Sequence, residues 1–372
     1  MAAGLEGVVA AQTSLSWIDG KRGMLVYRGY AIDDLARHAT FEEVVHLLLE
    51  GSLPTPDQLA EVGKRLGEEA PLDPLAVTTL GLLPTTTIPM EALRTGVSLL
   101  SAGEGVPTYD ADDPDSSRGH AYRIVAKLPT LIGTFHRLRQ GLEPVVPDPE
   151  RPVAYNLLRG ILGEEPGDDA VAAMDCALVL HAEHTLNAST FAARITAGTL
   201  SDIYSAITSA VGTLRGPLHG GANEKVAELL ESIASLDDVE AAIDDKLARK
   251  ERIMGFGHRV YKTEDPRGPH LRDWAERLAD QAGRRELFET ALKVQQVVFD
   301  RKGLYINVDF YSAPLYTAMG IPRDLFTPLF AASRAAGWTA HVLEQQANNR
   351  LIRPSSEYVG EREATWVALE DR

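Results

Sequence analysis

Histidines placed beside glycines are the first residues of this chain whose types and spacing indicate chemistry. Residues 215–226 read Arg-Gly-Pro-Leu-His-Gly-Gly-Ala-Asn-Glu-Lys-Val, and these glycines permit a tight turn and the close approach of another molecule. We expect His219 at or just before a helix N-terminus, where the partial positive charge disfavours the imidazolium. A neutral imidazole that donates one hydrogen bond is suited to polarising a carbonyl during enolisation. The alternative is a histidine that fills a turn.

A second histidine, His258, lies in the glycine-rich segment Gly-Phe-Gly-His-Arg at 255–259. The segment is not a dinucleotide fingerprint, because the third glycine and the strand-turn-helix frame are missing. Its glycines permit a flat ring or a pyrophosphate to approach the backbone. Arg267 follows near the first turn of a predicted helix, where a cation opposes the helix dipole. A bound anion would relieve that conflict, and an exposed arginine pointing to water is the alternative.

A carboxylate and further arginines complete the candidates. Asp309 lies among Val, Phe and Tyr in 307–312, surroundings that would raise its pKa toward that of a general base, although an N-cap role competes. Arg334 lies in an apolar helical pattern, where a cation needs a partner. Arg350 and Arg353 follow the last predicted helix, and capping of its C-terminus would account for both. Arginine forks match dicarboxylates, and a His/Asp pair matches proton abstraction beside a carbonyl.

Two further histidines, His181 and His184, are three residues apart, a spacing that can hold a metal ion. A third ligand is not evident nearby, and there is no His-Glu-x-x-His pattern. Residues 170–184 are apolar nearly all round, which predicts a buried helix with His184 at its end. A polar residue in that place more often faces a ligand or a hydrogen-bond partner.

The elements that must position these residues are mostly helical. Strand-like residues gather at 8–17 and 24–27 around a turn at 18–21, which predicts a hairpin. Thr40-Phe41-Glu42-Glu43 is a capping box that starts a helix, and Pro56 opens the next one. Periodicity predicts further helices along most of the chain, and the all-α class follows.

Five later segments complete the pattern of predicted elements. Residues 109–117 are acidic and rich in Pro and Ser, which predicts an exposed loop. Helices are predicted over 188–197, 322–336 and 338–348, and the tail after Pro354 is expected to be irregular. At 372 residues the chain exceeds one ordinary core, so two domains are expected.

Composition excludes several classes of function. The formal charge of −16 argues against nucleic acid and anionic membranes as partners, so an anion site must be built from locally gathered arginines. No apolar run reaches the roughly 18 residues that a membrane helix needs, and the first six residues lack the features of a targeting peptide. One cysteine, Cys176, cannot form an internal disulfide. We expect a cytoplasmic protein.

Taken together in order, these motifs resemble those of the citrate synthase family over nearly the whole chain. They are Glu183-His184-x-x-Asn187, Gly216-Pro217-Leu218-His219-Gly220-Gly221-Ala222-Asn223, Gly255-Phe256-Gly257-His258-Arg259-Val260-Tyr261-Lys262-Thr263-x-Asp265-Pro266-Arg267, Asn307-Val308-Asp309 and Arg353-Pro354. The resemblance implies an all-α fold, assembled as a homodimer, in which two domains close over a cleft. The small domain would span 221–320, and the large domain would combine 1–220 with 321–372.

The resemblance also implies a role for each candidate. Asp309 would take a methyl proton from acetyl-CoA, His219 would hydrogen-bond the thioester carbonyl, and His258 would polarise the ketone of oxaloacetate. The implied oxaloacetate ligands are His184, Arg267, Arg334 and, from the partner subunit, Arg353. The implied CoA-binding residues are Arg252, Ile253, Met254, Gly255, Phe256 and Lys262. No metal or cofactor is implied, since acetyl-CoA is a co-substrate.

Departures and alternatives accompany this resemblance. Glu183 stands where the family usually has Asp, and the chain starts directly at the hairpin, so a plain dimer without NADH control is expected. A 2-methylcitrate synthase would use propionyl-CoA with the same residues, and one methylene is worth only about 1–3 kcal/mol in a pocket. A metal-dependent hydrolase using His181 and His184, and a CoA-binding relative without activity, are the alternatives from other classes.

Overall fold

A small antiparallel sheet lies near the start of the chain in this computed structural model, which describes residues 3–5, 7–103 and 105–372. Its strands, paired in chain order, are β1 (Ser16–Asp19), β2 (Met24–Tyr27) and β3 (Tyr30–Ala31). The predicted hairpin is confirmed, but its first strand begins at Ser16 instead of residue 8. Val8 and Val9 are exposed and outside any strand, because a β-branched side chain favours a strand only where it packs on a sheet.

Sixteen α-helices follow within the described residues and confirm the all-α prediction. They are α1 (Ile32–His38), α2 (Phe41–Glu50), α3 (Pro56–Glu69), α4 (Pro74–Leu82), α5 (Pro89–Leu99), α6 (Pro114–Leu138), α7 (Val153–Leu162), α8 (Asp168–His181), α9 (Ala188–Ala197), α10 (Ile203–Leu214), α11 (Ala222–Ser232), α12 (Val239–Ala248), α13 (Gly268–Gln281), α14 (Arg285–Lys302), α15 (Val308–Ala318) and α16 (Phe326–Ala347). Short 3₁₀ turns occur at Ala3–Leu5, Leu236–Asp238, Arg323–Leu325 and Leu369–Asp371.

Local capping signals set several helix ends where they were predicted. The Thr40 hydroxyl accepts the Glu43 N–H at 3.3 Å, and Glu43 Oε2 accepts the Thr40 N–H at 2.7 Å, so the capping box starts α2. Pro56 is the first residue of α3, where its missing N–H costs nothing. Asn187 caps α9 by accepting the Thr190 N–H at 3.1 Å.

Two predicted boundaries in the first half are wrong. The expected loop over 109–117 ends early, because Asp113 caps α6 by accepting the Asp115 N–H at 2.9 Å, and Pro114 is the first helical residue. The buried helix predicted over 170–184 ends at His181. His184 therefore lies in the loop after α8, where Thr185 takes a left-handed conformation with φ of 52°.

Gly337 does not end a helix, although the sequence predicts a break there. α16 runs unbroken from Phe326 to Ala347. A Cβ on Gly337 would lie 2.4 Å from the carbonyl oxygen of Ala182, and the Gly337 N–H donates to that oxygen at 3.1 Å. The glycine therefore permits α16 to approach the loop after α8, which is a packing role and not a helix stop.

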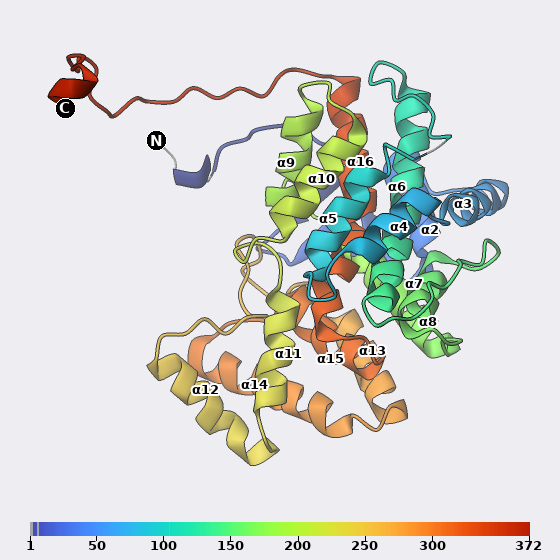
Figure 1. Cartoon of the computed structure of the whole chain (residues 1–372). Helices are drawn as coiled ribbons and strands as arrows, with labels where there is room; N and C mark the ends of the chain where they lie inside the picture. The colour runs from blue at the N-terminus through green and yellow to red at the C-terminus, as the bar shows by residue number, and fades with distance from the viewer. Residues whose placement is uncertain (1–2, 6, 104) are drawn as a thin grey trace.

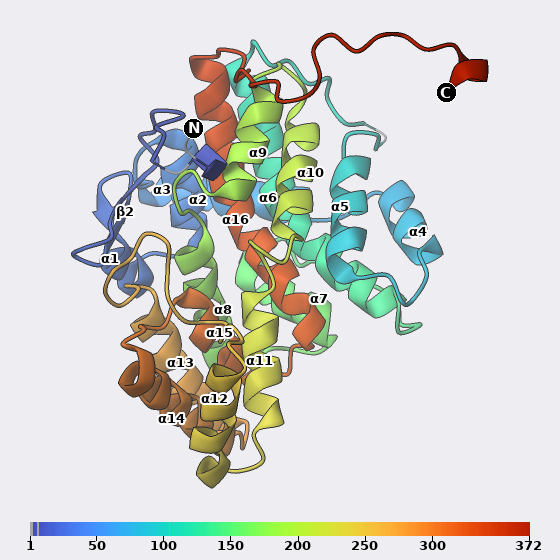
Figure 2. The same cartoon turned by 90° about the vertical axis from the view of Figure 1, so that its left-hand side faces the viewer.

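The helices form two groups, one around α16 and one built from α11 to α15. α16 crosses the middle of the larger group and contacts α2, α6, α8, α9 and α10, and Figures 1 and 2 show these helices around it. In the second group α13 packs on α15, and α11 packs on α15 and α14. α13 also contacts α8 of the larger group, so the two groups meet along α8.

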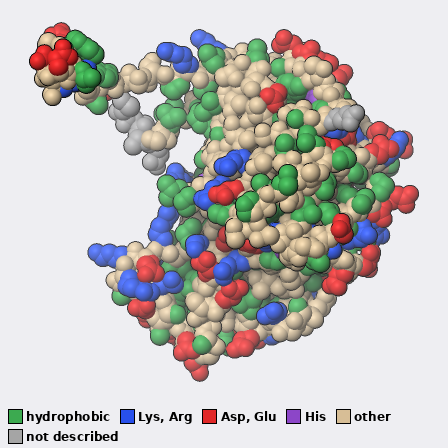
Figure 3. Space-filling model, in the orientation of Figure 1, with side chains coloured by type: hydrophobic (Ala, Val, Ile, Leu, Met, Phe, Trp, Pro, Cys, Tyr) green, Lys and Arg blue, Asp and Glu red, His purple; other side chains and the backbone are tan. Residues whose placement is uncertain are grey.

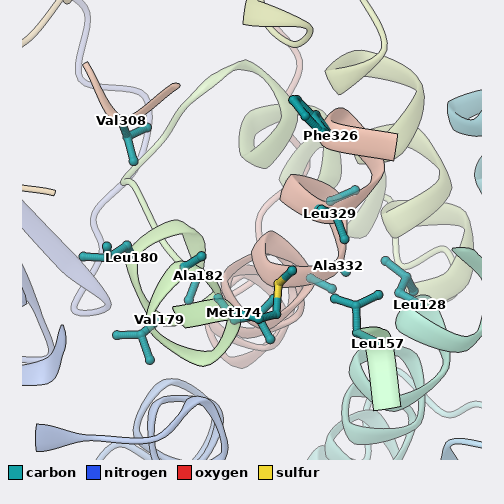
Figure 4. Packing of buried hydrophobic residues seen from close by; sticks show 14 of the residues in the cluster. Leu128, Leu157, Met174, Val179, Leu180, Ala182, Val308, Phe326, Leu329 and Ala332 are labelled. Atoms are coloured by element: carbon teal, nitrogen blue, oxygen red, sulfur yellow. The ribbon is translucent and has the colours of Figure 1, made fainter. Parts of the chain in front are cut away.

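The core between α6, α7, α8 and α16 holds the larger group together. Leu128, Leu157, Met174, Leu329 and Ala332 come from these four helices, point toward one another and are at most 1% exposed (Figure 4). Burial of one such leucine or methionine stabilises the fold by about 1.5–3 kcal/mol relative to exposure. This core fixes the end of α8, from which the candidate site begins.

None of the helices in the described residues is long and apolar enough to cross a membrane. The prediction that a targeting peptide is absent concerns the first six residues, of which Met1, Ala2 and Glu6 lie outside the described residues.

Candidate active site

The loop 182–187 between α8 and α9 carries the first candidate, His184. Its side chain is buried, and its Nε2 lies 3.3 Å from the hydroxyl of Tyr261 in the second helical group. The ring centroids of His184 and His258 are 5.1 Å apart. Burial, with smaller contributions from Arg267 and Arg334, lowers the pKa of His184 well below its usual value. The site therefore lies where the two helical groups meet.

His258 is held in one tautomer by the backbone of its own loop. The N–H groups of Val260 and Tyr261 donate to His258 Nδ1 at 3.0 and 3.2 Å. A backbone amide only donates, so Nδ1 accepts and the proton of the neutral ring is on Nε2. Burial first, and then Arg267, lowers the pKa of His258 to about 4, so the ring is neutral at pH 7. Its Nε2–H remains to donate to a carbonyl oxygen.

The glycines of this loop join it to the start of α15. Gly255 has a left-handed φ of 84°, and its carbonyl oxygen accepts the Asn307 N–H at 2.9 Å. The Gly257 N–H donates to the Tyr305 carbonyl at 2.8 Å. The sequence predicts that another molecule approaches the backbone at these glycines. That space is partly filled by Tyr305 and Asn307 of the same chain.

His219 occupies the predicted turn directly before α11 and makes its contact with Ser189. The Ser189 N–H donates to His219 Nε2 at 3.3 Å, and Ser189 Oγ lies 2.8 Å from the same nitrogen. Because Nε2 accepts, the proton of the neutral ring is on Nδ1. Burial, followed by Arg334, lowers the pKa of His219 to about 4. The neutral ring agrees with our prediction, but burial and not the helix dipole is its main cause.

Asp309 lies in the first turn of α15, where it is partly buried. Asn307 is the N-cap, since its Oδ1 accepts the Asp309 N–H at 3.1 Å, so the capping alternative for Asp309 is wrong. Burial raises the pKa of Asp309 to about 6, although Arg267 and Arg334 act to lower it. Such a carboxylate is ionised at pH 7 and is a stronger base than an exposed aspartate.

The two buried arginines have different partners. Arg267 makes a two-pronged ion pair with Asp265 at 2.9 and 2.7 Å, which raises the pKa of this guanidinium despite its burial. The negative charge that we expected a bound anion to bring to Arg267 is therefore supplied by Asp265 of the same chain. Arg334 forms no salt bridge within the described residues, and its Nε donates to the His181 carbonyl at 2.6 Å. Burial lowers the pKa of Arg334 to about 10, although the negative charge of Glu183 acts to raise it.

Arg353 is not brought to this site by its own chain. It is exposed and lies after α16, in a C-terminal segment that stands off the body (Figures 1 and 3). The same segment exposes apolar side chains, with Tyr358 61% exposed and Trp366 80% exposed. The tail is irregular up to its last turn at Leu369–Asp371, as predicted.

The candidate CoA-binding residues surround the loop of His258. Arg252 and Lys262 are exposed cations at its two ends, while Ile253, Met254 and Phe256 are partly buried and Gly255 is buried. The ring of Phe256 lies 4.8 Å from that of Phe310, which follows Asp309. These positions leave the cations free to meet a phosphate, and the role of these residues remains a prediction.

Sequence reasoning missed Ser189, Tyr261 and Asp265 as members of the site. Asp265 and Tyr261 stand inside the motif around His258, but nothing in their spacing shows which side chain each would meet. Ser189 lies 30 residues before His219, so no local pattern pairs them. The His181 Nδ1 bonds to the Ala177 carbonyl at 2.7 Å, and no group of three metal-binding side chains occurs in the described part of the chain, so the metal alternative gains no support.

Comparisons with known proteins agree with this geometry. A family model described as citrate synthase, C-terminal domain, matches residues 4–355. Citrate synthase 2 of Bacillus subtilis is 46% identical over 99% of this chain and 98% of its own length. A 2-methylcitrate synthase of Shewanella oneidensis is 41% identical over 96% of this chain and 94% of its own.

Solved structures give the same result. A ternary complex of citrate synthase from Thermoplasma acidophilum with carboxymethyl coenzyme A and oxaloacetate matches with a TM-score of 0.93 and 33% identity, over 100% of this chain and 99% of the other. The citrate synthase of Thermotoga maritima matches with a TM-score of 0.89 and 37% identity, over 100% and 99%. A helical acyltransferase is thus the class that fold and site define. The chain belongs to the citrate synthase family.

Proposed function

We propose that this protein condenses acetyl-CoA with oxaloacetate and water to give citrate and CoA. The observation that carries the proposal is a raised-pKa carboxylate, Asp309, that shares buried charged neighbours with two neutral histidines, each with one ring N–H to donate. Arg334 acts on both Asp309 and His219, and Arg267 acts on both Asp309 and His258. Two buried arginines lie within electrostatic reach of the same residues. A base, two carbonyl-polarising donors and a dianion site are what the condensation needs.

Proton removal and carbonyl stabilisation act together in the first step. A carboxylate alone is too weak to take a proton from the methyl group of a thioester, so charge on the carbonyl oxygen must be stabilised as it develops. Asp309 takes the methyl proton, while the Nδ1–H of His219 donates to the thioester oxygen. Because His219 is neutral, it donates a hydrogen bond without first losing a charge.

The oxaloacetate side of the reaction uses the second histidine and the arginines. The Nε2–H of His258 donates to the ketone oxygen, which draws electrons from the carbon that the enolate attacks. Arg334 lacks a carboxylate partner in the described residues and is suited to bind one carboxylate of oxaloacetate. His184 and Arg267 would bind the same oxaloacetate molecule. After the carbon–carbon bond has formed, water hydrolyses the thioester of citryl-CoA.

The Asp309→Asn variant tests the role of the base. Its side chain keeps the shape but cannot accept the proton, so kcat should fall at least about a thousandfold. Oxaloacetate binding, measured by calorimetry, should stay within about twofold of wild type because the arginines remain. Turnover near the wild-type rate in this variant would remove Asp309 from the mechanism.

Acyl preference separates two members of the family. We propose that acetyl-CoA is preferred, since relatives with 42–46% identity are named citrate synthases. A Bacillus subtilis relative named citrate/2-methylcitrate synthase is 40% identical, so the second activity is the alternative. The test is CoA release with oxaloacetate, comparing kcat/KM for acetyl-CoA and propionyl-CoA. A higher value for propionyl-CoA would assign the protein to the 2-methylcitrate branch with its mechanism unchanged.

We also propose a homodimer in which Arg353 completes the partner's site. The exposed apolar side chains of the tail, such as Trp366 and Val359, support a partner surface there. Co-expression of Asp309→Asn with Arg353→Gln tests it, because a mixed dimer has one site with neither change. Half of the dimers should be mixed, so about a quarter of wild-type activity should return although each variant alone is inactive. No recovery would show that Arg353 acts in its own subunit, and an Arg353→Gln variant that is active alone would show that Arg353 has no role in the site.

The location and the CoA contacts are proposals of the same kind. We place the protein in the cytoplasm, because its single cysteine is buried and offers no disulfide. Lys262→Ala and Arg252→Ala should each raise the KM for acetyl-CoA without changing the Kd of oxaloacetate, since they remove cations from the loop beside His258.

A further inference from the structure

The short loop 182–187 and the first turn of α9 together support two histidines of the proposed site. His184 belongs to the loop, and Ser189 in that first turn makes the contact that fixes the tautomer of His219. The loop contains Thr185 with φ of 52°, a left-handed conformation that a β-branched residue rarely adopts. A conformation of this kind persists only where neighbouring groups hold it, so its supports determine where His184 points.

A fully buried carboxylate, Glu183, is the centre of those supports. Its Oε1 accepts hydrogen bonds from the Ser16 hydroxyl at 2.9 Å and from His341 Nε2 at 3.0 Å. The Ser16 oxygen in turn accepts the Thr185 N–H at 3.0 Å. The Glu183 N–H donates to the hydroxyl of Tyr27 at 3.2 Å. The carboxylate is therefore connected through one hydroxyl to the strained residue next to His184.

A chain of hydrogen bonds through His341 and Arg194 fixes Glu183 from behind. Arg194 donates to His341 Nδ1 at 3.0 Å and to Glu344 Oε2 at 2.7 Å. Arginine only donates, so His341 accepts on Nδ1 and carries its proton on Nε2, where it points to Glu183. Burial acts to raise the pKa of Glu183, but His341 and Arg334 outweigh it and lower that pKa, which keeps the group ionised.

The space for this side chain is provided by α16. A Cβ on Gly337 would lie 2.3 Å from Glu183 Oε2, so any larger residue there would displace the carboxylate. The same oxygen has no hydrogen-bond partner within the described residues. The side chain of Glu183 is thus accommodated by a glycine on the facing helix.

We propose that Glu183 is a positioning residue for oxaloacetate, which sets the orientation of His184 through Ser16 and the Thr185 N–H. The inference rests on the condensation proposed above and adds a residue that touches neither substrate. Its effect is geometric: loss of the support lets the imidazole move, and a displacement near 1 Å is enough to cost up to about a hundredfold.

Ser16→Ala is the main test, because it removes the bridging hydroxyl without changing charge. The Kd and KM for oxaloacetate should rise about tenfold, while the KM for acetyl-CoA changes less than about twofold. Ser16→Thr, which restores a hydroxyl, should recover most of the affinity. Ser117→Ala is the matched control, since it removes another buried serine hydroxyl, in the first turn of α6, and should alter stability alone.

The Glu183→Gln variant distinguishes the support that Glu183 gives to the loop from its direct electrostatic effect on a bound dianion. Removal of a negative charge near Arg334 would by electrostatics alone tighten the binding of a dianion. Weaker support of the loop would loosen it, because hydrogen bonds to an ionised group are about twice as strong as neutral ones. We expect looser binding. Glu42→Gln is the control, a buried glutamate that accepts the Val153 N–H at 2.8 Å away from the site.

The outcomes distinguish this inference from the function on which it rests. Wild-type protein that neither binds oxaloacetate nor releases CoA would remove the proposed function. An active wild type with unchanged oxaloacetate affinity in Ser16→Ala, or with tighter binding in Glu183→Gln, would leave the function standing and overturn the positioning role. A rise in Kd equal to that of the control variants would do the same, since it would reflect stability alone.

Discussion

Single residues of the site determine how activity depends on pH. The base, Asp309, must be ionised to accept a proton, and burial raises its pKa to about 6. A raised pKa means that the protonated, inactive form is populated at higher pH than for an exposed aspartate. We expect kcat/KM for acetyl-CoA to fall tenfold per pH unit below about pH 6. A profile that stays flat to pH 5 would contradict this assignment, and stability at each pH is the control.

Ser189 allows a test of the His219 tautomer. Its hydroxyl lies 2.8 Å from His219 Nε2 and accepts the Trp338 Nε1–H at 3.1 Å. Ser189→Ala removes this contact but keeps the backbone N–H, so the ring should hold its tautomer less firmly. We expect kcat to fall about tenfold with little change in the Kd of oxaloacetate. An equal loss in both constants would show that the whole loop has moved.

At the scale of elements, the hairpin turn touches the loop that carries His258. The Lys262 N–H donates to the Gly20 carbonyl at 2.8 Å, and a Cβ on Gly20 would lie 2.1 Å from the Val260 carbonyl oxygen. Gly20→Ala should push this loop away and raise the KM for oxaloacetate about tenfold. Gly63→Ala is the control, because a Cβ there meets no atom within 4 Å. It should stabilise α3 by about 0.5–1 kcal/mol without altering kinetics.

Local sequence signals predicted the ends of helices where the hydrogen-bond partner lies only a few residues away along the chain. The capping box at Thr40 gave the start of α2, because its hydrogen bonds span three residues. Gly337 misled the prediction, since its reason is the approach of Ala182, 155 residues away in sequence. A glycine that makes room for a distant backbone is indistinguishable in sequence from one that ends a helix.

The candidate site was likewise predictable from local motifs but not in its distant contacts. The motifs located His219, His258 and Asp309, and the structure places all three on short turns or helix starts. The sequence could not predict partners that are distant along the chain, such as Ser16 for Glu183, 167 positions away, and Ser189 for His219, 30 positions away. Such pairings depend on how whole elements pack, which periodicity does not encode.

At the scale of the molecule, contacts between the two helical groups predict closure on substrate. Arg277 of α13 pairs with Asp169 of α8 at 2.5 Å, and Tyr261 reaches His184. Oxaloacetate would bind residues from both groups and so favour the state in which they meet. In the Asp309→Asn variant, which cannot turn over, oxaloacetate should strengthen acetyl-CoA binding at least about tenfold by calorimetry. Equal affinity with and without oxaloacetate would rule out this coupling.

The central position of α16 has a consequence for how the chain is made. This helix contacts α2, α6, α8, α9 and α10, yet it ends at Ala347, about 130 residues after α10 is complete. A ribosome adds roughly 5–20 residues per second, so the nascent chain exposes an unfilled apolar groove for on the order of ten seconds. The whole second helical group, α11 to α15, is synthesised during that interval. Productive folding of the nascent chain therefore competes with aggregation of its exposed core until α16 has been synthesised.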